Sequence, residues 1–326
     1  VKVAPEADMK LAATYTDWKD ANGTALVATE GGKGTPWRIY EGHTMPLLTA
    51  LMKGTKRLEK VYDGNVFTTT DPHITLVHTG KDVGTYDAYS DQFGYDLIGG
   101  AVIKPKSLTL GFTNGTRFDK TYDGSDTVTR TLTKGTNYSL TGFVGSEGAD
   151  VELAGAVTGA YADKNAGRDK EVTFQNLALT GTGAGNYTIT KAQGVGTITP
   201  KQLNLALASG TRFDKIYDGT ANVAQTLAKG TNYSLTGFVT GEGNGIALGS
   251  STGTYSDKNA SADKAVTFDG LTLTGTGAAN YVLNRTSLAG IGTISRRALT
   301  LGTVAAQTKT YDGKTAADAA KFRAAL

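Results

Sequence analysis

Two loops of this chain combine carboxylate and amide oxygens at close, repeated spacing. Oxygen ligands that lie two and six residues apart suit a hard cation such as calcium. The candidate ligands are Asp163, Asn165 and Asp169 in the first loop, and Asp257, Asn259 and Asp263 in the second. The same D-x-N pattern is typical of an Asx turn, which needs no ion, so both interpretations stay open. We expect no cofactor other than this possible calcium.

A second candidate site consists of tyrosines that follow an asparagine. The N-Y pairs contain Tyr138, Tyr187, Tyr233 and Tyr281. Aromatic rings that share an exposed face can bind sugars, whereas strand alternation would place many of these rings in the core. The four tyrosines are therefore either a ligand-binding face for carbohydrate or packing residues.

Residues suited to catalysis are few, and we expect no enzyme. The three histidines, His43, His73 and His78, lie outside the repeated part of the chain. The whole chain has no cysteine. No serine stands in a G-x-S-x-G context. His73 and His78 could hold a metal with Asp71 only if a turn separated them, because five-residue spacing on a strand puts the rings on opposite faces. The glycine-rich loop at Gly181 lacks the lysine and the following helix of a phosphate site.

The charge pattern argues against nucleic acid and membrane partners. The chain has 33 basic and 30 acidic residues, a formal net charge of +3, spread without blocks. We find no apolar run long enough to span a bilayer and no signal peptide. Because the chain begins at Val1 and ends soon after a Y-D-G segment at Tyr311, we expect it to be a piece of a longer protein. The absence of cysteine suits export through an oxidising compartment.

The elements that must position these residues occur twice. R-F-D-K-T-Y-D-G at Arg117 returns as R-F-D-K-I-Y-D-G at Arg212, an offset of 95 residues, and N-Y-S-L-T-G-F at Asn137 returns at Asn232 with the same offset. The later Y-x-D-K-N-A and L-T-G-T-G-A segments are 94 residues apart, so a glycine-rich loop has lost one residue. Tandem units of this size indicate an array of modules, and such arrays usually serve reach, display or multivalent contact.

The periodicity within each unit is that of strands. Polar and apolar residues alternate over 107–110, 202–207, 298–301, 170–179 and 264–273. The intervening G-T-G-A and D-K-N segments supply turns. We therefore expect an all-β fold, an elongated tandem array whose modules are either sandwiches or β-grasp-like sheets. Helical pattern is limited to Pro46–Lys53 and to an alanine-rich segment, Thr315–Leu326.

The K-x-Y-D-G segment occurs four times, at Tyr62, Tyr122, Tyr217 and Tyr311. In such a segment the aspartate can bond to its own backbone and the glycine can take a positive φ, which makes a turn. The tyrosine would pack its ring and send its hydroxyl to a partner. We interpret the segment as a structural turn of each module, with a repeated ligand contact through Lys, Tyr and Asp as the alternative.

The order of K-x-Y-D-G, D-K-N-A, G-T-G-A-G-N-Y-T-I-T and G-x-G-T-I-T-P-K resembles the YDG-type repeats of large secreted bacterial adhesins. These include filamentous-haemagglutinin-like exoproteins exported by two-partner secretion. The resemblance covers residues 108–295 in two full units. Residues 58–106 resemble a shorter unit without the D-K-N and G-T-G-A-x-N-Y segments. The segment that begins at Trp37, W-R-I-Y-E-G-H-T-M-P-L-L, is similar to the sequence that ends the β-helical shaft of such adhesins, with Trp18 in the last rung or cap.

The resemblance implies five segments. These are the end of a β-helix shaft and its cap (1–57), a short YDG-like module (58–106), two full YDG repeats (107–201 and 202–297) and the truncated start of a further repeat (298–326). The linking segments are short and strand-like, which predicts semi-rigid junctions. Below, the second to fourth segments are called the short module, the first repeat and the second repeat.

The resemblance also implies a location and partners. The protein would be secreted or lie on the bacterial cell surface, after export by an outer-membrane transporter. The parent adhesin would contact host-cell or matrix glycans or proteins, and no nucleic acid. The expected function is that of a structural stalk and display segment. The alternative is a set of carbohydrate-binding modules that contact host glycan or matrix polysaccharide. An enzyme acting on polysaccharide would need a unique acidic or histidine cluster, and none stands out.

Overall fold

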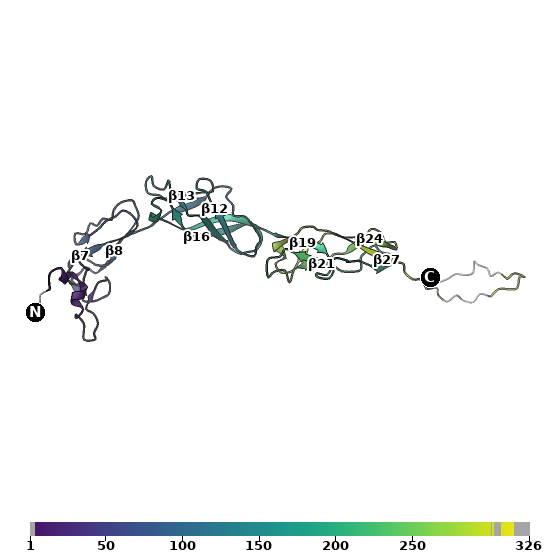
Figure 1. The fold of residues 1–326 in the computed structure, drawn as a ribbon, viewed down its shortest axis with the longest axis horizontal. Coiled ribbons are helices and arrows are strands. Elements are labelled where there is room, and N and C mark those ends of the chain that lie inside the picture. Colours follow the sequence, from purple (N-terminus) through teal and green to yellow (C-terminus); the bar gives the residue numbers. More distant parts are fainter. Residues whose placement is uncertain (1–3, 301, 303–307, 316–326) are drawn as a thin grey trace. The chain divides into compact units, whose positions relative to one another are not determined.

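The computed structural model describes residues 4–300, 302 and 308–315, which fold as strands joined by tight turns (Figure 1). The chain forms two compact units. The first consists of residues 1–120, 126–163 and 169–197, and the second of residues 121–125, 164–168 and 198–326. Two short loops of the first repeat, 121–125 and 164–168, thus belong to the second unit. The prediction of an all-β tandem array is confirmed.

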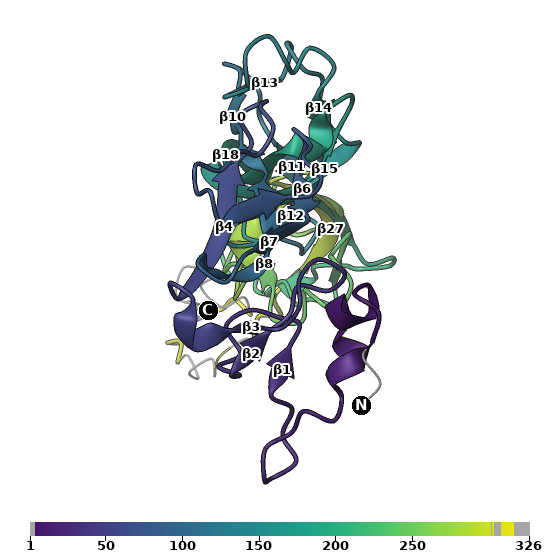
Figure 2. The same cartoon turned by 90° about the vertical axis from the view of Figure 1, so that its left-hand side faces the viewer.

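Residues 4–54 of the first unit contain only short elements. These are the 3₁₀ helices η1 (Asp8–Lys10), η2 (Ala12–Tyr15) and η3 (Thr49–Leu51), and the strands β1 (Val27–Ala28), β2 (Trp37–Arg38) and β3 (Leu47–Leu48). Strand β2 pairs in parallel with β1 and antiparallel with β3 (Figure 2). The indole ring of Trp18 packs edge-on against that of Trp37, with 5.6 Å between centroids. The prediction that residues 1–57 end a β-helix stays a prediction.

The helix predicted over Pro46–Lys53 is wrong. The segment forms strand β3 and the single 3₁₀ turn η3. The side-chain amide of Gln92 accepts a hydrogen bond from the Leu48 N–H and donates one to the Leu48 carbonyl, both at 2.8 Å. Because the N–H and the carbonyl of Leu48 both bind Gln92, neither can form the backbone hydrogen bonds of a helix.

The short module follows in the same unit. Its strands are β4 (Thr55–Val61), β5 (Ile74–Leu76), β6 (Gly84–Tyr86), β7 (Ala88–Ser90), β8 (Asp96–Lys104) and β9 (Lys106–Ser107). Strand β8 lies between β4, which is parallel to it, and β6, which is antiparallel. The buried guanidinium of Arg38 pairs with the buried carboxylate of Asp96 (Nε–Oδ1 3.1 Å), and this ion pair joins β2 to β8.

The first repeat is built from nine strands and one 3₁₀ helix. They are β10 (Thr109–Phe112), β11 (Lys120–Thr121), β12 (Thr127–Thr131), β13 (Tyr138–Thr141), β14 (Glu152–Leu153), β15 (Ala156–Tyr161), β16 (Gly167–Leu177), β17 (Leu179–Thr180), η4 (Ala184–Asn186) and β18 (Tyr187–Thr199). The largest sheet has the order β11-β18-β16-β15-β12, and β9 also pairs with β18. Two further pairs are β10-β13 and β14-β17.

The second repeat follows the same plan. Its elements are β19 (Lys201–Leu207), β20 (Lys215–Ile216), β21 (Tyr233–Thr236), β22 (Ala247–Leu248), β23 (Gly253–Tyr255), β24 (Ser261–Phe268), β25 (Leu273–Thr274), η5 (Ala278–Asn280), β26 (Tyr281–Leu283) and β27 (Leu288–Ser295). The sheets have the orders β21-β19-β26, β20-β27-β24-β23 and β22-β25.

The core of the second repeat lies between its two larger sheets. Leu205 and Leu235 come from the β21-β19-β26 sheet, whereas Val266 and Phe268 come from β24 of the other sheet, and all four side chains are buried. The ring of Phe213 fills the space beside Phe268, 4.8 Å between centroids. Two sheets around one apolar layer correspond to the sandwich alternative.

Most of the predicted strands are confirmed. Of residues 170–179, all but residue 178 lie in β16 and β17. Residues 264–268 lie in β24, with every second side chain buried from Lys264 on, and residue 273 lies in β25, whereas residues 269–272 connect the two strands. Residues 298–300, in contrast, are not in a strand. The corresponding strand β19 is held by β21 and β26, which come later in its own repeat, and no described residue after 300 supplies such partners. Residues 316–326 of the predicted C-terminal helix lie outside the described residues.

Candidate functional site at the module joints

The K-x-Y-D-G segments are turns, as predicted. The glycines Gly64, Gly124, Gly219 and Gly313 have φ between 73° and 84°. In each turn the aspartate carboxylate accepts a hydrogen bond from the backbone N–H two residues later, at 2.9 to 3.0 Å. The lysine ammonium of Lys60, Lys215 and Lys309 pairs with the aspartate of its own turn, at 2.6 to 2.8 Å. The turn therefore fixes where the tyrosine leaves the backbone.

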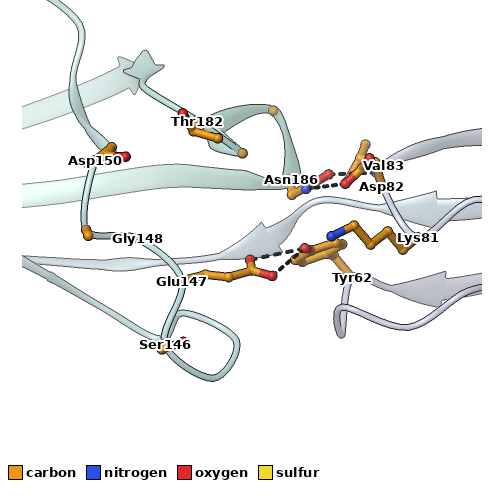
Figure 3. A pocket seen from close by; sticks show the side chains of 13 residues that line it. Tyr62, Lys81, Asp82, Val83, Ser146, Glu147, Gly148, Asp150, Thr182 and Asn186 are labelled. Carbon is orange, nitrogen blue, oxygen red and sulfur yellow. Dashed lines mark hydrogen bonds between the residues drawn. The ribbon is translucent and has the colours of Figure 1, made fainter.

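The tyrosine of the first turn binds a glutamate of the next module. Tyr62 is 2% exposed and its hydroxyl donates to Glu147, 2.9 Å from Oε1 (Figure 3). Tyr187 donates to the other oxygen of the same carboxylate, Oε2, at 2.5 Å. The two tyrosine rings pack edge-to-face with 5.4 Å between centroids. Glu147 thus joins a tyrosine of the short module to a tyrosine of the first repeat.

A buried asparagine makes the second contact of this joint. Asn186 ends η4, which follows Gly183 in the left-handed conformation (φ 76°). Its side-chain oxygen accepts a hydrogen bond from Val83 N–H at 2.8 Å, and its amide nitrogen donates to Asp82 Oδ1 at 2.8 Å (Figure 3). An asparagine that is 6% exposed therefore has both ends of its amide satisfied by the short module. We call this set of contacts the first joint.

The second unit contains the same arrangement, which we call the second joint. Tyr122 donates to Glu242 Oε1 at 2.8 Å, Tyr281 donates to Glu242 Oε2 at 2.5 Å, and their ring centroids are again 5.4 Å apart. Lys164 Nζ lies 3.0 Å from Glu242 Oε1. Tyr122 and Lys164 belong to the two loops of the first repeat that are part of the second unit.

The asparagine contact also recurs in the second joint. Asn280 ends η5 and is 5% exposed. Its side-chain oxygen accepts from Ala166 N–H at 2.8 Å, and its amide nitrogen donates to Asn165 Oδ1 at 3.1 Å. Both joints therefore combine a carboxylate between two tyrosines with an asparagine that binds a loop backbone.

The electrostatics favour neutral tyrosines in both joints and an ionised Glu242 in the second joint. Burial and the hydrogen bond to Glu147 raise the pKa of Tyr62 to about 12, and burial and the bond to Glu242 raise the pKa of Tyr281 to about 12. The hydrogen bond from Tyr281, followed by those from Lys164 and Tyr122, lowers the pKa of Glu242. Hydrogen bonds to an ionised acceptor are the stronger kind, about 1.5–3 kcal/mol each. None of these shifts brings a group near neutrality, where general acid–base catalysis works best.

A groove of about 680 Å³ opens at the first joint (Figure 3). Its polar lining includes Tyr62, Asp82, Glu147 and Asn186. These groups already bind one another across the joint, so they are not free to orient a small ligand. The arrangement is suited to holding two modules together.

The sequence alone does not reveal the joints. Their glutamate and asparagine lie in F-V-x-x-E-G, at Phe143 and Phe238, and in the N-Y pairs. The repetition of these segments was a usable signal, but nothing in it identifies the partner. In the short module, K-D-V at Lys81 takes the place of K-N-A at Lys164, and this likeness is too short to recognise without the structure.

The candidate calcium ligands make other contacts in the structure, and their role as a cation site stays a prediction. The four aspartates are paired with basic side chains, in the pairs Asp163–Lys170, Asp169–Arg117, Asp257–Lys264 and Asp263–Arg212, at 2.6 to 2.8 Å. Asn165 binds Asn280, and the backbone N–H of Asn259 donates to Asp257 in an Asx turn. In the described part of the chain, no three His, Cys, Asp or Glu side chains gather as they would around a metal. The Asx-turn interpretation fits the second loop, because the Asp257 carboxylate accepts the hydrogen bond from its own backbone two residues later.

The candidate sugar-binding tyrosines are buried. Tyr138 and Tyr233 are each 1% exposed, and their hydroxyls accept hydrogen bonds from the backbone N–H of Leu153 (2.8 Å) and Leu248 (2.9 Å). Tyr187 and Tyr281 are the tyrosines of the two joints. A sugar-stacking face does not fit this burial, because stacking requires an exposed ring. All four side chains have the packing role.

Comparison with known families agrees with the repeats. The YDG domain family matches residues 104–194 and 199–288. No curated protein and no solved structure matches the chain. Among the described residues, no helix has the length and apolar character needed to cross a membrane. Because the two matched ranges cover more than half of the 326 residues, the chain belongs to the YDG domain family, with two copies in tandem.

Proposed function

We propose that the chain is a structural stalk and display segment of a secreted bacterial surface adhesin, in which YDG modules act as spacers. In this proposal the parent protein resembles filamentous haemagglutinin, leaves the cell by two-partner secretion through an outer-membrane transporter, and carries its receptor contacts elsewhere. We assign no catalytic activity to the modules.

The observation that carries the proposal is the double occurrence of the joint. Corresponding residues build the same Tyr–Glu–Tyr contact and the same asparagine contact twice, once in each compact unit. A spacer array needs every consecutive pair of modules to hold together, and each of these contacts joins one module to the next. Charge-assisted hydrogen bonds from buried tyrosines to a carboxylate are suited to that task.

The candidate residues for sugar binding and for calcium binding have structural contacts, which supports the spacer proposal. The N-Y tyrosines are packed, and the aspartates of the D-K-N loops are neutralised by lysine or arginine. The most regular features of the repeats are therefore used for folding and joining the modules.

A binding measurement separates the spacer from the carbohydrate-binding alternative. The purified chain is applied to glycan and polysaccharide arrays, once with calcium and once with chelator. We expect no saturable binding in either condition. Saturable binding that is lost when equivalent exposed residues of both repeats are substituted would overturn the spacer proposal in favour of carbohydrate binding.

A mechanical measurement tests the positive side of the proposal. The repeats have a period of 95 residues, and an extended chain spans at most about 3.3–3.6 Å per residue, so each repeat should lengthen by about 300 Å when it unfolds under force. Single-molecule pulling of the whole chain should give two such events of similar force. Extension of both repeats at negligible force would contradict a spacer role.

A further inference from the structure

The second repeat carries a third copy of the surface that the preceding modules use in the joints. In the second joint this surface consists of Tyr122, Gly124 and the loop Lys164-Asn165-Ala166. The corresponding residues of the second repeat are Tyr217, Gly219 and the loop Lys258-Asn259-Ala260. We call this set the open face.

The Y-D-G turn of the open face has the same geometry as the turns in the two joints. Asp218 accepts the hydrogen bond from Thr220 N–H at 2.9 Å, and Lys215 pairs with Asp218 at 2.8 Å. Gly219 has φ 84°, against 82° for Gly124 and 79° for Gly64. The turn therefore presents Tyr217 as the other turns present Tyr62 and Tyr122.

The open face differs from the two joint surfaces in its solvent exposure. Tyr62 and Tyr122 are buried, whereas Tyr217 is half-buried and the Lys258-Asn259-Ala260 loop is exposed. Within the described ranges, neither the Tyr217 hydroxyl nor the Ala260 N–H makes a hydrogen bond, although Ala166 N–H binds Asn280 at 2.8 Å.

The space beside the turn glycine shows the same contrast. A Cβ atom added at Gly124 would lie 2.8 Å from a Val239 methyl, and one at Gly64 would lie 3.0 Å from a Val144 methyl. A Cβ at Gly219 would meet nothing within 4 Å. The valine of an F-V-x-x-E-G segment is thus the group missing from the third copy.

We propose that the open face is the docking surface for a further YDG repeat, the one whose start, residues 298–326, contains the K-T-Y-D-G segment at Tyr311. The glutamate of its F-V-x-x-E-G segment would bind Tyr217 and Lys258, and the asparagine of its N-Y pair would bind Ala260 N–H. Tyr311 lies 94 residues after Tyr217, which continues the period of the repeats. This inference rests on the proposed spacer function and names the partner of the joint surface.

A second copy of the chain is not the occupant. Both glutamates of the joint type in the described residues are already bound, Glu147 by Tyr62 and Glu242 by Tyr122. A copy of the chain could offer such a carboxylate only by breaking one of its own joints. A repeat that follows the second repeat brings a new glutamate and asparagine.

The test adds the missing partner to the whole chain. Residues 202–297 are duplicated directly after Arg297, in place of 298–326, so that the added copy starts in the same register as the second repeat does after Lys201. Amide hydrogen exchange at Ala260 is then compared between the original and the extended chain, with Ala166 as the internal standard for an occupied face. We expect exchange at Ala260 to slow to the level of Ala166. Asn280→Ala, placed only in the added copy, should restore fast exchange.

A shortened chain provides an independent check if the added copy does not fold. Deletion of residues 107–201 joins Lys106 to Gln202 and preserves the P-K sequence before the strand, since Pro105-Lys106 matches Pro200-Lys201. If the two surfaces recognise each other as proposed, Val83 N–H of the short module keeps its protection, now through Asn280 instead of Asn186. Loss of that protection in a folded second repeat argues against a general docking surface.

The outcomes separate the inference from the proposed function. Fast exchange at Ala260 next to a folded added copy, with Ala166 protected, overturns the inference and leaves the two existing joints intact. Fast exchange at both Ala260 and Ala166 means that the joints themselves do not hold, and the spacer function fails with them.

Discussion

The second joint should weaken measurably when one hydroxyl is removed. Tyr122→Phe keeps the ring, which is 1% exposed and packs edge-to-face on Tyr281, and deletes only the hydrogen bond to Glu242. The matched control is Tyr217→Phe, the same position of the second repeat, where no carboxylate binds the hydroxyl among the described residues.

The expected magnitude follows from what Glu242 keeps. A hydrogen bond to an ionised acceptor contributes about 1.5–3 kcal/mol. Glu242 retains Tyr281 and Lys164, and its side chain is 25% exposed, so water can replace part of the lost bond. We therefore expect Tyr122→Phe to cost about 1–1.5 kcal/mol in the free energy of opening the joint, near the lower limit of that range. Tyr217→Phe should stay within about 0.5 kcal/mol.

Hydrogen exchange is the suitable assay. The only tryptophans are Trp18 and Trp37, so tryptophan fluorescence does not report on the second unit. Exchange at Ala166 N–H, whose partner is Asn280, reports opening of the joint. A loss of about 1–1.5 kcal/mol accelerates exchange roughly five- to twelvefold, since 1.4 kcal/mol is a factor of ten.

A double-mutant cycle with Glu242→Gln completes the experiment. If Tyr122 and Glu242 interact as the distances indicate, the two substitutions should be non-additive by at least about 0.5 kcal/mol. Additive effects, or an effect of Tyr122→Phe no larger than that of Tyr217→Phe, would refute the reasoning.

Three further predictions follow from other contacts. Asp96→Asn leaves buried Arg38 without its carboxylate and should cost about 3–5 kcal/mol, read from the unfolding curve by tryptophan fluorescence; a loss below about 1 kcal/mol would mean that the pair is not buried as described. Because the pKa values of Tyr62 and Tyr281 are raised from 10.0 to about 12, their contribution to stability is complete below pH 10 and should be lost between pH 10 and 12, as urea midpoints will show; an unchanged midpoint across that range argues against the joints. Calcium should leave the melting temperature unchanged, whereas a site filled at 100 times its Kd would add about 2.7 kcal/mol, a difference that calorimetry with calcium and with chelator detects.

The sequence determined the longer strands and the turns. Alternation of apolar residues is a local property, so the strands β19 and β24 could be predicted from Gln202–Leu207 and Lys264–Phe268 alone. The Y-D-G turns were equally readable, since an aspartate that binds its own backbone and a glycine at positive φ are contained within a few residues. The repeat period can also be read from the sequence, as the distance between the repeated segments.

Only the tertiary structure decided which side chains meet. Arg117 and Asp169 form an ion pair 52 residues apart, so a candidate calcium ligand has a partner that its own loop does not contain. Tyr122 and Glu242 meet across 120 residues, from loops whose sequences carry no sign of each other. Hydrogen bonds of this kind depend on how two modules pack, and the packing is set by burial of the tyrosine rings rather than by any pattern along the chain.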